Sequence, residues 1–258
     1  MLIAERIKMA VLPVARGVRV RDVRIGLIYT AVTLEDGRTG LSFTFHRGRR
    51  GNCRRLQAVC PLRGREASEL VELLDAPEEV ERAVALATVN ALSNSGTGDV
   101  REGDFLGMLD IRPGERVGMV GLFSPVLPRL NERTSSILIF EQNPDPGREA
   151  DLLQEEDAYR LLPGCGVAVI TSTSIVNQTI DRLLAAACNC REVVLLGAST
   201  PLVPEAFAAT PVTLLSGVIV LDSEEILRLV SEAGGTRSFK NHVRKVNVAL
   251  KTPPLQEG

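Results

Sequence analysis

The side chains best suited to chemistry follow two apolar stretches of this 258-residue chain. After the run 167–170 come Thr171, Ser172, Thr173, Ser174 and Asn177, and after the run 193–196 come Gly197, Ser199 and Thr200. Hydroxyl and amide groups donate and accept hydrogen bonds. If these clusters also start helices, free backbone N–H groups add an attraction for anions. The two clusters therefore indicate a site for an anionic or hydroxyl-rich ligand, although small polar residues also make turns and helix caps.

Helix capping explains only one member of the first cluster. Ser174 is the expected N-cap, because a helical apolar stripe begins within two turns of it. A cap needs one such side chain, so the others are available for a ligand. Asn177 could bind the edge of a heterocycle with both its donor and its acceptor. The residues expected to contact a ligand from the two clusters are Ser172, Thr173, Asn177, Gly197, Ser199 and Thr200.

A third candidate feature is the G-x-x-G pair of Gly118 and Gly121, followed by Glu141 20 positions after Gly121. Glycines allow close approach of backbone to ligand, and an acidic residue at this spacing can accept hydrogen bonds from ribose hydroxyls. Pro125 and Pro128 delay the next helix, which disfavours a dinucleotide. A nucleoside-type ligand such as S-adenosylmethionine fits better, while the alternative is that Glu141 is simply the first solvated residue after a strand.

Few acid–base groups accompany these residues. We expect Glu141, Asp222 and Lys245 to be the catalytic candidates. The two histidines, His46 and His242, are far apart in the chain, which disfavours a metal site with several histidines. No G-x-S-x-G or G-x-x-x-x-G-K-[ST] motif is found, so the sequence matches no standard hydrolase or nucleotide-triphosphatase site.

The elements that must position these residues are buried parallel strands. Several apolar runs are continuous, as expected for strands covered by helices on both faces. Strands are predicted at Arg116–Val120, Ser136–Phe140, Val167–Ile170, Glu192–Leu196 and Val212–Ser216, with helices at 175–188 and Ser223–Ala233 among those between them. This pattern predicts an α/β fold with a Rossmann-like doubly wound sheet. In such sheets ligands bind beyond the carboxyl ends of the strands.

Residues 1–94 follow a different pattern and are predicted to form a smaller α+β domain before the Rossmann-like domain of residues 95–258. It begins with an amphipathic helix and continues with a hairpin at Asp36-Gly37, where a type I′ turn is expected. Two helical stretches follow, 67–76 and 77–92. Asn90 and Asn94 are polar residues at the end of the second stretch. We expect the two domains to pack together, with Asn90 facing the ligand-binding strand ends.

Composition narrows the class of protein. The chain is 45% hydrophobic and 24% charged, with a formal net charge of -2. It has no basic surplus for nucleic acid and no apolar run of the ~20 residues that a membrane span requires. Glu5, Arg6 and Lys8 interrupt the first apolar stretch, so we expect a cytoplasmic protein without a signal peptide. A small molecule is the expected partner, and a homo-oligomer is compatible with the sequence.

Several motifs together resemble a known family, the putative heavy-metal chelation domain. They are GMVGLFSP, FEQNP, VAVITSTSIVNQTIDRLL, VVLLGASTPLVPEAF, LLSGVIVLD and EAGGTRSF, and IGLIYTAV and ALATVNALSN resemble the domain that usually precedes it. The resemblance implies an enolase-N-terminal-like domain, a Rossmann-like domain and a site in the crevice between them. One departure is Ala198, where the family pattern has proline.

The resemblance and the residues lead to three functional hypotheses. The first is an enzyme for condensation, hydrolysis or group transfer on a pterin-, flavin- or siderophore-like metabolite linked to metal chelation. The second is a non-catalytic protein that binds a metal chelate. The third is an S-adenosylmethionine-dependent methyltransferase, which rests on the glycines and Glu141.

The sequence also predicts that Cys188 and Cys190 hold no structural metal. Their C-x-C spacing lacks a second ligand pair, and Cys188 is in phase with the apolar face of the predicted helix 175–188, so burial is expected. Elemental analysis should therefore give no stoichiometric zinc. Zinc that disappears in a Cys188→Ser/Cys190→Ser variant would contradict this.

Overall fold

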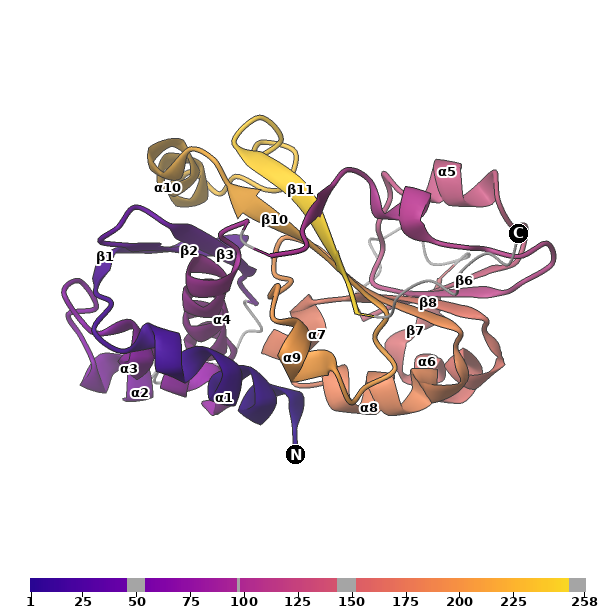
Figure 1. Ribbon diagram of the computed structural model, residues 1–258, viewed down its shortest axis with the longest axis horizontal. Helices are drawn as coiled ribbons and strands as arrows, with labels where there is room; N and C mark the ends of the chain where they lie inside the picture. Colours follow the sequence, from indigo (N-terminus) through magenta and orange to yellow (C-terminus); the bar gives the residue numbers. More distant parts are fainter. Residues whose placement is uncertain (46–53, 97, 143–151, 251–258) are drawn as a thin grey trace.

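The computed structural model describes residues 1–45, 54–96, 98–142 and 152–250. It contains a three-stranded antiparallel sheet, built from the first part of the chain, and an eight-stranded, mostly parallel sheet (Figure 1). Helix α1 (Ile3–Ala15) precedes strands β1 (Val20–Ile25), β2 (Tyr29–Leu34) and β3 (Thr39–Phe43), which pair in chain order.

The hairpin between β2 and β3 is confirmed, but the expected turn type is wrong. Gly37 has φ +91°, whereas Asp36 is not among the residues with positive φ. The Gly37 N–H donates to Leu34 O at 3.0 Å, and the Leu34 N–H donates to Arg38 O at 2.9 Å. This is a three-residue loop with one left-handed glycine, which needs positive φ at a single position.

Helix α4 (Glu79–Ser93) covers one face of this sheet after the short α2 (Arg54–Ala58), α3 (Ala67–Val71) and η1 (Glu72–Asp75). Its contact with β3 depends on Gly40. A Cβ atom on Gly40 would lie 2.1 Å from Ala87 O and 2.2 Å from Ala91 N. The absence of a side chain at this position therefore lets helix and sheet backbones touch.

The large sheet has the order β4-β11-β10-β9-β8-β5-β6-β7. Five of its strands match the predicted ones within about two residues, apart from a longer β10: β5 (Val117–Val120), β6 (Ile137–Glu141), β8 (Val167–Thr171), β9 (Glu192–Leu196) and β10 (Leu214–Val220). Sequence patterning did not predict the edge strands β4 (Arg101–Glu102) and β7 (Leu153–Gln154), nor β11 (Val243–Ala249), which lies between β4 and β10. The core strands are parallel, and β11 is antiparallel to β10.

The helices around the large sheet are short. They are η2 (Phe105–Met108), α5 (Leu127–Asn131), α6 (Glu155–Leu161), η4 (Leu162–Gly164), α7 (Thr173–Val176), α8 (Ile180–Ala186), η5 (Ala187–Asn189), α9 (Pro204–Phe207) and α10 (Ser223–Ser231). The single helix expected over 175–188 is wrong. It is broken between α7 and α8, where Gln178 has φ +62°.

Helix α10 belongs to the large-sheet half of the chain but packs on the small sheet. Ile226 and Val230 join Tyr29 and Leu41 in one buried cluster. The Ser223 hydroxyl donates to Gly37 O at 2.8 Å. The small sheet is thus held between α4 on one face and α10 on the other (Figure 1).

Two expectations concern the chain as a whole. Within the described ranges, no helix is long and apolar enough to cross a membrane. The boundary at residue 94 stays a prediction. The largest buried cluster extends from Ile3 to Val248 and includes side chains from both sides of that boundary.

The contact at Gly40 generates a stability prediction. Gly40→Ala should lower the free energy of unfolding by about 2–4 kcal/mol, because the new methyl group forces α4 away from the sheet. Gly107→Ala is the control, since nothing lies within 4 Å of its added Cβ among the described residues. Urea unfolding of both variants measures the difference. A Gly40→Ala protein as stable as wild type would refute the close contact.

Candidate functional site

The order of the large sheet fixes where a ligand could bind. From β5 the chain continues to β6 on one side and later returns to β8 on the other side. The strand order therefore reverses between β5 and β8, and crevices form at such switch points beyond the carboxyl ends of the strands. Gly121 and Thr171 stand at these two strand ends.

Gly121 lets the two strand ends come close together. Its φ is +88°, and an added Cβ would lie 3.0 Å from the Cβ of Thr171. Gly118 has a different role, since its added Cβ would lie 2.5 Å from Leu162 Cδ2 within the helix–sheet packing. Of the two predicted glycines, only Gly121 borders the switch point.

Glu141 ends β6 next to this position, but its carboxylate is used locally. One oxygen accepts the Leu122 N–H at 2.9 Å, and the other accepts the Gln142 N–H at 2.8 Å. These bonds hold the turn that follows β5. A carboxylate can accept about four hydrogen bonds, so these two bonds orient Glu141 without excluding a ribose hydroxyl.

The polar segment after β8 folds differently from the expectation. Ser174 is not the N-cap: it lies within α7, and its hydroxyl donates to Thr171 O at 2.6 Å. Ser172 occupies the N-cap position, without a side-chain capping bond. Asn177 Oδ1 accepts from the Thr179 N–H at 3.1 Å and from the Thr179 hydroxyl at 2.8 Å. Asn177 therefore closes the turn between α7 and α8.

The two hydroxyl clusters do meet, as expected, but most of their hydroxyls are buried. Ser172 Oγ and Thr200 Oγ1 are 2.7 Å apart, and both residues are fully buried. Ser199 Oγ accepts the Phe43 N–H of the small sheet at 2.8 Å. These three side chains join the strand ends to each other and to the first part of the chain.

Thr171 and Thr173 are the hydroxyl residues of the first cluster that stay partly exposed at the switch point. Their Oγ1 atoms are 3.0 Å apart. Gly197, at the end of β9, also stays accessible: it has φ +128°, and no described heavy atom lies within 4 Å of its added Cβ. The accessible part of the predicted site is therefore made by Thr173, Asn177, Gly197, Gly121 and Glu141, and Thr171 lies beside Thr173.

The asparagines of α4 contribute to the contact between the two halves. Asn94 Nδ2 donates to Thr200 O at 3.0 Å and Val218 O at 3.1 Å, and its Oδ1 accepts the Leu202 N–H at 2.9 Å. Asn90 is buried and donates to Leu41 O at 2.7 Å. Arg82 Nε donates to Val176 O, so the helix that carries Asn90 packs against α7.

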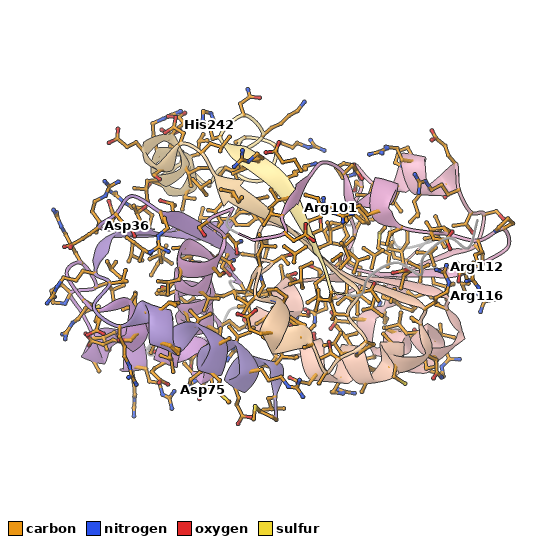
Figure 2. All side chains as sticks on the ribbon, in the orientation of Figure 1. Asp36, Asp75, Arg101, Arg112, Arg116 and His242 are labelled. Atoms are coloured by element: carbon orange, nitrogen blue, oxygen red, sulfur yellow. The ribbon has the colours of Figure 1, made fainter. Side chains whose placement is uncertain are left out.

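The structure does not bring the three acid–base candidates together. Glu141 ends β6 and Asp222 follows β10, with β5, β8 and β9 in between. At about 4.8 Å per strand spacing, they are on the order of 19 Å apart. Asp222 caps α10 by accepting the Glu225 N–H at 3.0 Å, and Lys245 is exposed on β11. Figure 2 labels His242 near α10, where its Nδ1 lies 3.5 Å from Asp222 Oδ2.

Cys165, Cys188 and Cys190 lie at the opposite, amino-terminal end of the strands, and Cys60 lies between α2 and α3. Cys188 is exposed, so its expected burial is wrong, because the helix has already ended at Ala186. Cys165 and Cys190 are buried. Burial raises the pKa of Cys190 to about 12, so this thiol stays protonated at neutral pH. His46 and Cys53 lie outside the described residues.

One pocket combines residues that sequence reasoning missed. It has a volume of about 540 Å³ and lies between β1 and α10. Arg21 and Arg63 line it, although they come from separate segments that share no motif. No periodicity or spacing signal could have connected them.

The geometry defines a class of protein: a Rossmann-like α/β domain whose polar strand ends pack against a smaller α+β domain. Two family models, each described as putative heavy-metal chelation, match this chain: the DUF4213 model matches residues 9–93, and the DUF364 model matches residues 104–249, which is more than half of the chain. The chain belongs to this putative heavy-metal chelation family, as the motifs predicted.

Known relatives match nearly the whole chain, and two of them share its fold. An uncharacterized protein of Methanocaldococcus jannaschii is 24% identical over 242 residues, which are 90% of this chain and 91% of that protein. Crystal structures of two proteins of unknown function from the DUF364 family are similar. The Pyrococcus horikoshii protein has a TM-score of 0.83 and 23% identity, with 96% of this chain and 100% of that chain covered. The Desulfitobacterium hafniense protein has a TM-score of 0.81 and 24% identity, covering 96% and 98%. The predicted fold class is confirmed.

The contacts of Asn94 lead to a prediction about the joint between the halves. Asn94→Ala should lower the free energy of unfolding by about 2–4 kcal/mol, because it leaves a buried N–H and two buried carbonyls without their partner. Asn177→Ala removes only the half-buried hydrogen bonds of a local turn, so it should lower the free energy of unfolding by about 1 kcal/mol or less. Thermal and urea unfolding compare the two. Equal losses would mean that the joint does not depend on Asn94.

Proposed function

We propose that this protein binds a small organic metal chelator, free or metal-loaded, at the carboxyl ends of β5 and β8. The ligand is held by hydroxyl and backbone groups of the protein. The metal is cargo and reaches the protein inside the chelator. This is the second of the three hypotheses drawn from the sequence.

The observation that carries the proposal is the hydroxyl pair at the switch point. Thr171 and Thr173 stay partly exposed, with their Oγ1 atoms 3.0 Å apart, beside the glycine backbone of Gly121. One of these hydroxyls donates to the other, so the pair offers a ligand one remaining O–H donor and several acceptor lone pairs. Such a pair suits the oxygen-rich or heterocyclic edge of a chelating molecule.

The distribution of metal-binding side chains supports a chelate as the ligand. Among the described residues, no three His, Cys, Asp or Glu side chains are grouped so that they could hold a metal ion. Structural zinc sites usually need four such ligands, and calcium sites need six or more oxygens. A metal that arrives already chelated needs few ligands or none from the protein.

Binding is favoured over catalysis by the arrangement of the acid–base groups. A general base must lie within hydrogen-bond reach of the proton it removes. Glu141 ends β6 and Asp222 follows β10, and each of these strands is two spacings, or about 10 Å, from β8. The hydroxyls of Thr171 and Thr173 therefore have no assembled base among Glu141, Asp222 and Lys245.

The proposal predicts the behaviour of Thr173→Val, which removes a hydroxyl with almost no change in shape. Native mass spectrometry of freshly purified wild-type protein should detect a copurified small molecule. The dissociation constant of that molecule, titrated by native mass spectrometry, should rise about fivefold in Thr173→Val, since one hydrogen bond contributes about 1 kcal/mol.

Thr210→Val is the matched control. Thr210 is also half-buried, and its hydroxyl donates to Phe207 O at 2.7 Å. It precedes β10, so it lies at the amino-terminal end of the strands, away from the proposed site. It should keep the ligand. Protein stripped with EDTA and then given Zn²⁺ alone should retain only substoichiometric metal. Stoichiometric Zn²⁺ retained equally by wild type and Thr173→Val would contradict the proposal.

A further inference from the structure

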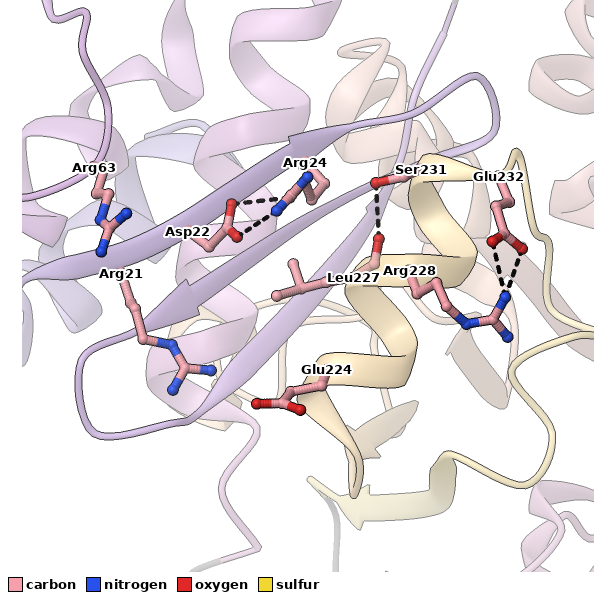
Figure 3. A pocket seen from close by; sticks show the side chains of 9 residues that line it. All are labelled: Arg21, Asp22, Arg24, Arg63, Glu224, Leu227, Arg228, Ser231 and Glu232. Atoms are coloured by element: carbon pink, nitrogen blue, oxygen red, sulfur yellow. Dashed lines mark hydrogen bonds and ion pairs between the residues drawn. The ribbon is translucent and has the colours of Figure 1, made fainter.

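The pocket between β1 and α10 is separate from the switch point. Its lining comes from β1, from the segment before α3 and from α10, whereas the proposed chelator site is formed at the ends of β5 and β8 (Figure 3). Its volume of about 540 Å³ falls within the range of small-molecule sites, about 300–1,000 Å³. Both halves of the chain contribute, so the pocket exists only while they are packed together.

Two of the four arginines in this pocket are already neutralised. Arg24 binds Asp22 through two hydrogen bonds of 3.0 and 2.9 Å. Arg228 binds both oxygens of Glu232 at 2.8 Å and also pairs with Glu225. These bidentate pairs occupy the guanidinium groups in the geometry that suits a carboxylate.

The other two arginines differ. Among the described residues, neither Arg21 nor Arg63 has a hydrogen-bond or ion-pair partner, and Figure 3 shows both on the side of the pocket opposite α10. Glu224, on α10, is the remaining charged residue of the lining without a partner in the same ranges. Two unpaired cations that line one pocket repel each other, and an anion between them would relieve this repulsion.

We propose that this pocket is a second binding site, for a small molecule that carries an oxyanion. The oxyanion, a carboxylate or a phosphate, binds between the guanidinium groups of Arg21 and Arg63. Planar guanidinium groups match both kinds of oxyanion through paired N–H donors. Glu224 faces this position from α10 and accepts a hydrogen bond from a hydroxyl or amino group on the same molecule. Occupancy would also strengthen the contact between β1 and α10.

Calorimetric titration of the full chain with sodium phosphate and with sodium citrate, at constant ionic strength, tests the site. Each probe should bind once per chain. Arg21→Gln and Arg63→Gln should each weaken binding about tenfold or more, because each removes a charge-assisted pair. Glu224→Gln should tighten phosphate binding, since it removes a negative charge from the lining. Tighter citrate binding would assign the oxyanion as a carboxylate, and tighter phosphate binding as a phosphate.

Arg16→Gln is the matched control, since Arg16 is an exposed arginine outside the lining. It should change affinity by less than about twofold. Thr173→Val should also leave phosphate and citrate binding unchanged, which separates this site from the proposed chelator site. No binding of either probe above the ionic-strength control would overturn the proposal. A loss of affinity in Arg16→Gln equal to the loss in Arg21→Gln would overturn the proposal as well.

Discussion

The complete burial of helix α4 is the constraint on which the rest of the structure depends. Every residue from Glu81 to Leu92 is buried, including the polar ones. A helix enclosed in this way requires a smooth sheet surface on one side, which Gly40 supplies, and partners for its polar groups on the other. Arg82 and Asn94 find those partners in backbone carbonyls of the large-sheet half. These bonds of Arg82 and Asn94 thereby fix the two halves of the chain to each other.

This enclosure also explains why most of the hydroxyl-rich strand ends are not free. Helices α4 and α10 cover the two faces of the small sheet. The end of β3 then meets the turn that follows β9, where Ser199 accepts the N–H of Phe43. Ser172 and Thr200 then satisfy each other in the same buried region. A buried hydroxyl without a partner costs free energy, and mutual pairing avoids this cost. The partly exposed residues at the β5–β8 switch point, and Gly197 at the end of β9, remain available to a ligand.

Sequence patterning predicted the parallel strands well, because continuous apolar runs such as 193–196 mark strands that are buried on both faces. It failed where a local hydrogen bond decides the outcome. Asn177 and Thr179 break the helix by an Asx turn, and the sequence alone does not distinguish that turn from a polar helix surface. For the site, spacing correctly indicated that two polar clusters share one edge. Spacing could not indicate which hydroxyls are buried, because their burial depends on the first part of the chain. It also could not indicate that Arg21 and Arg63 line one pocket.

The chemistry of the accessible side chains bears on how a member of this family could handle heavy metals. Soft metal ions prefer thiolates, but burial keeps the Cys190 thiol protonated, and it lies at the end of the sheet away from the switch point. The groups that do reach the switch point are neutral hydroxyls, backbone, and the one carboxylate of Glu141, whose oxygens accept the Leu122 and Gln142 N–H groups. Neutral hydrogen-bonding groups are weak competitors for a metal ion, so they would leave a chelate intact. A protein that carried bare metal would need the opposite arrangement, with exposed anionic ligands converging on one point.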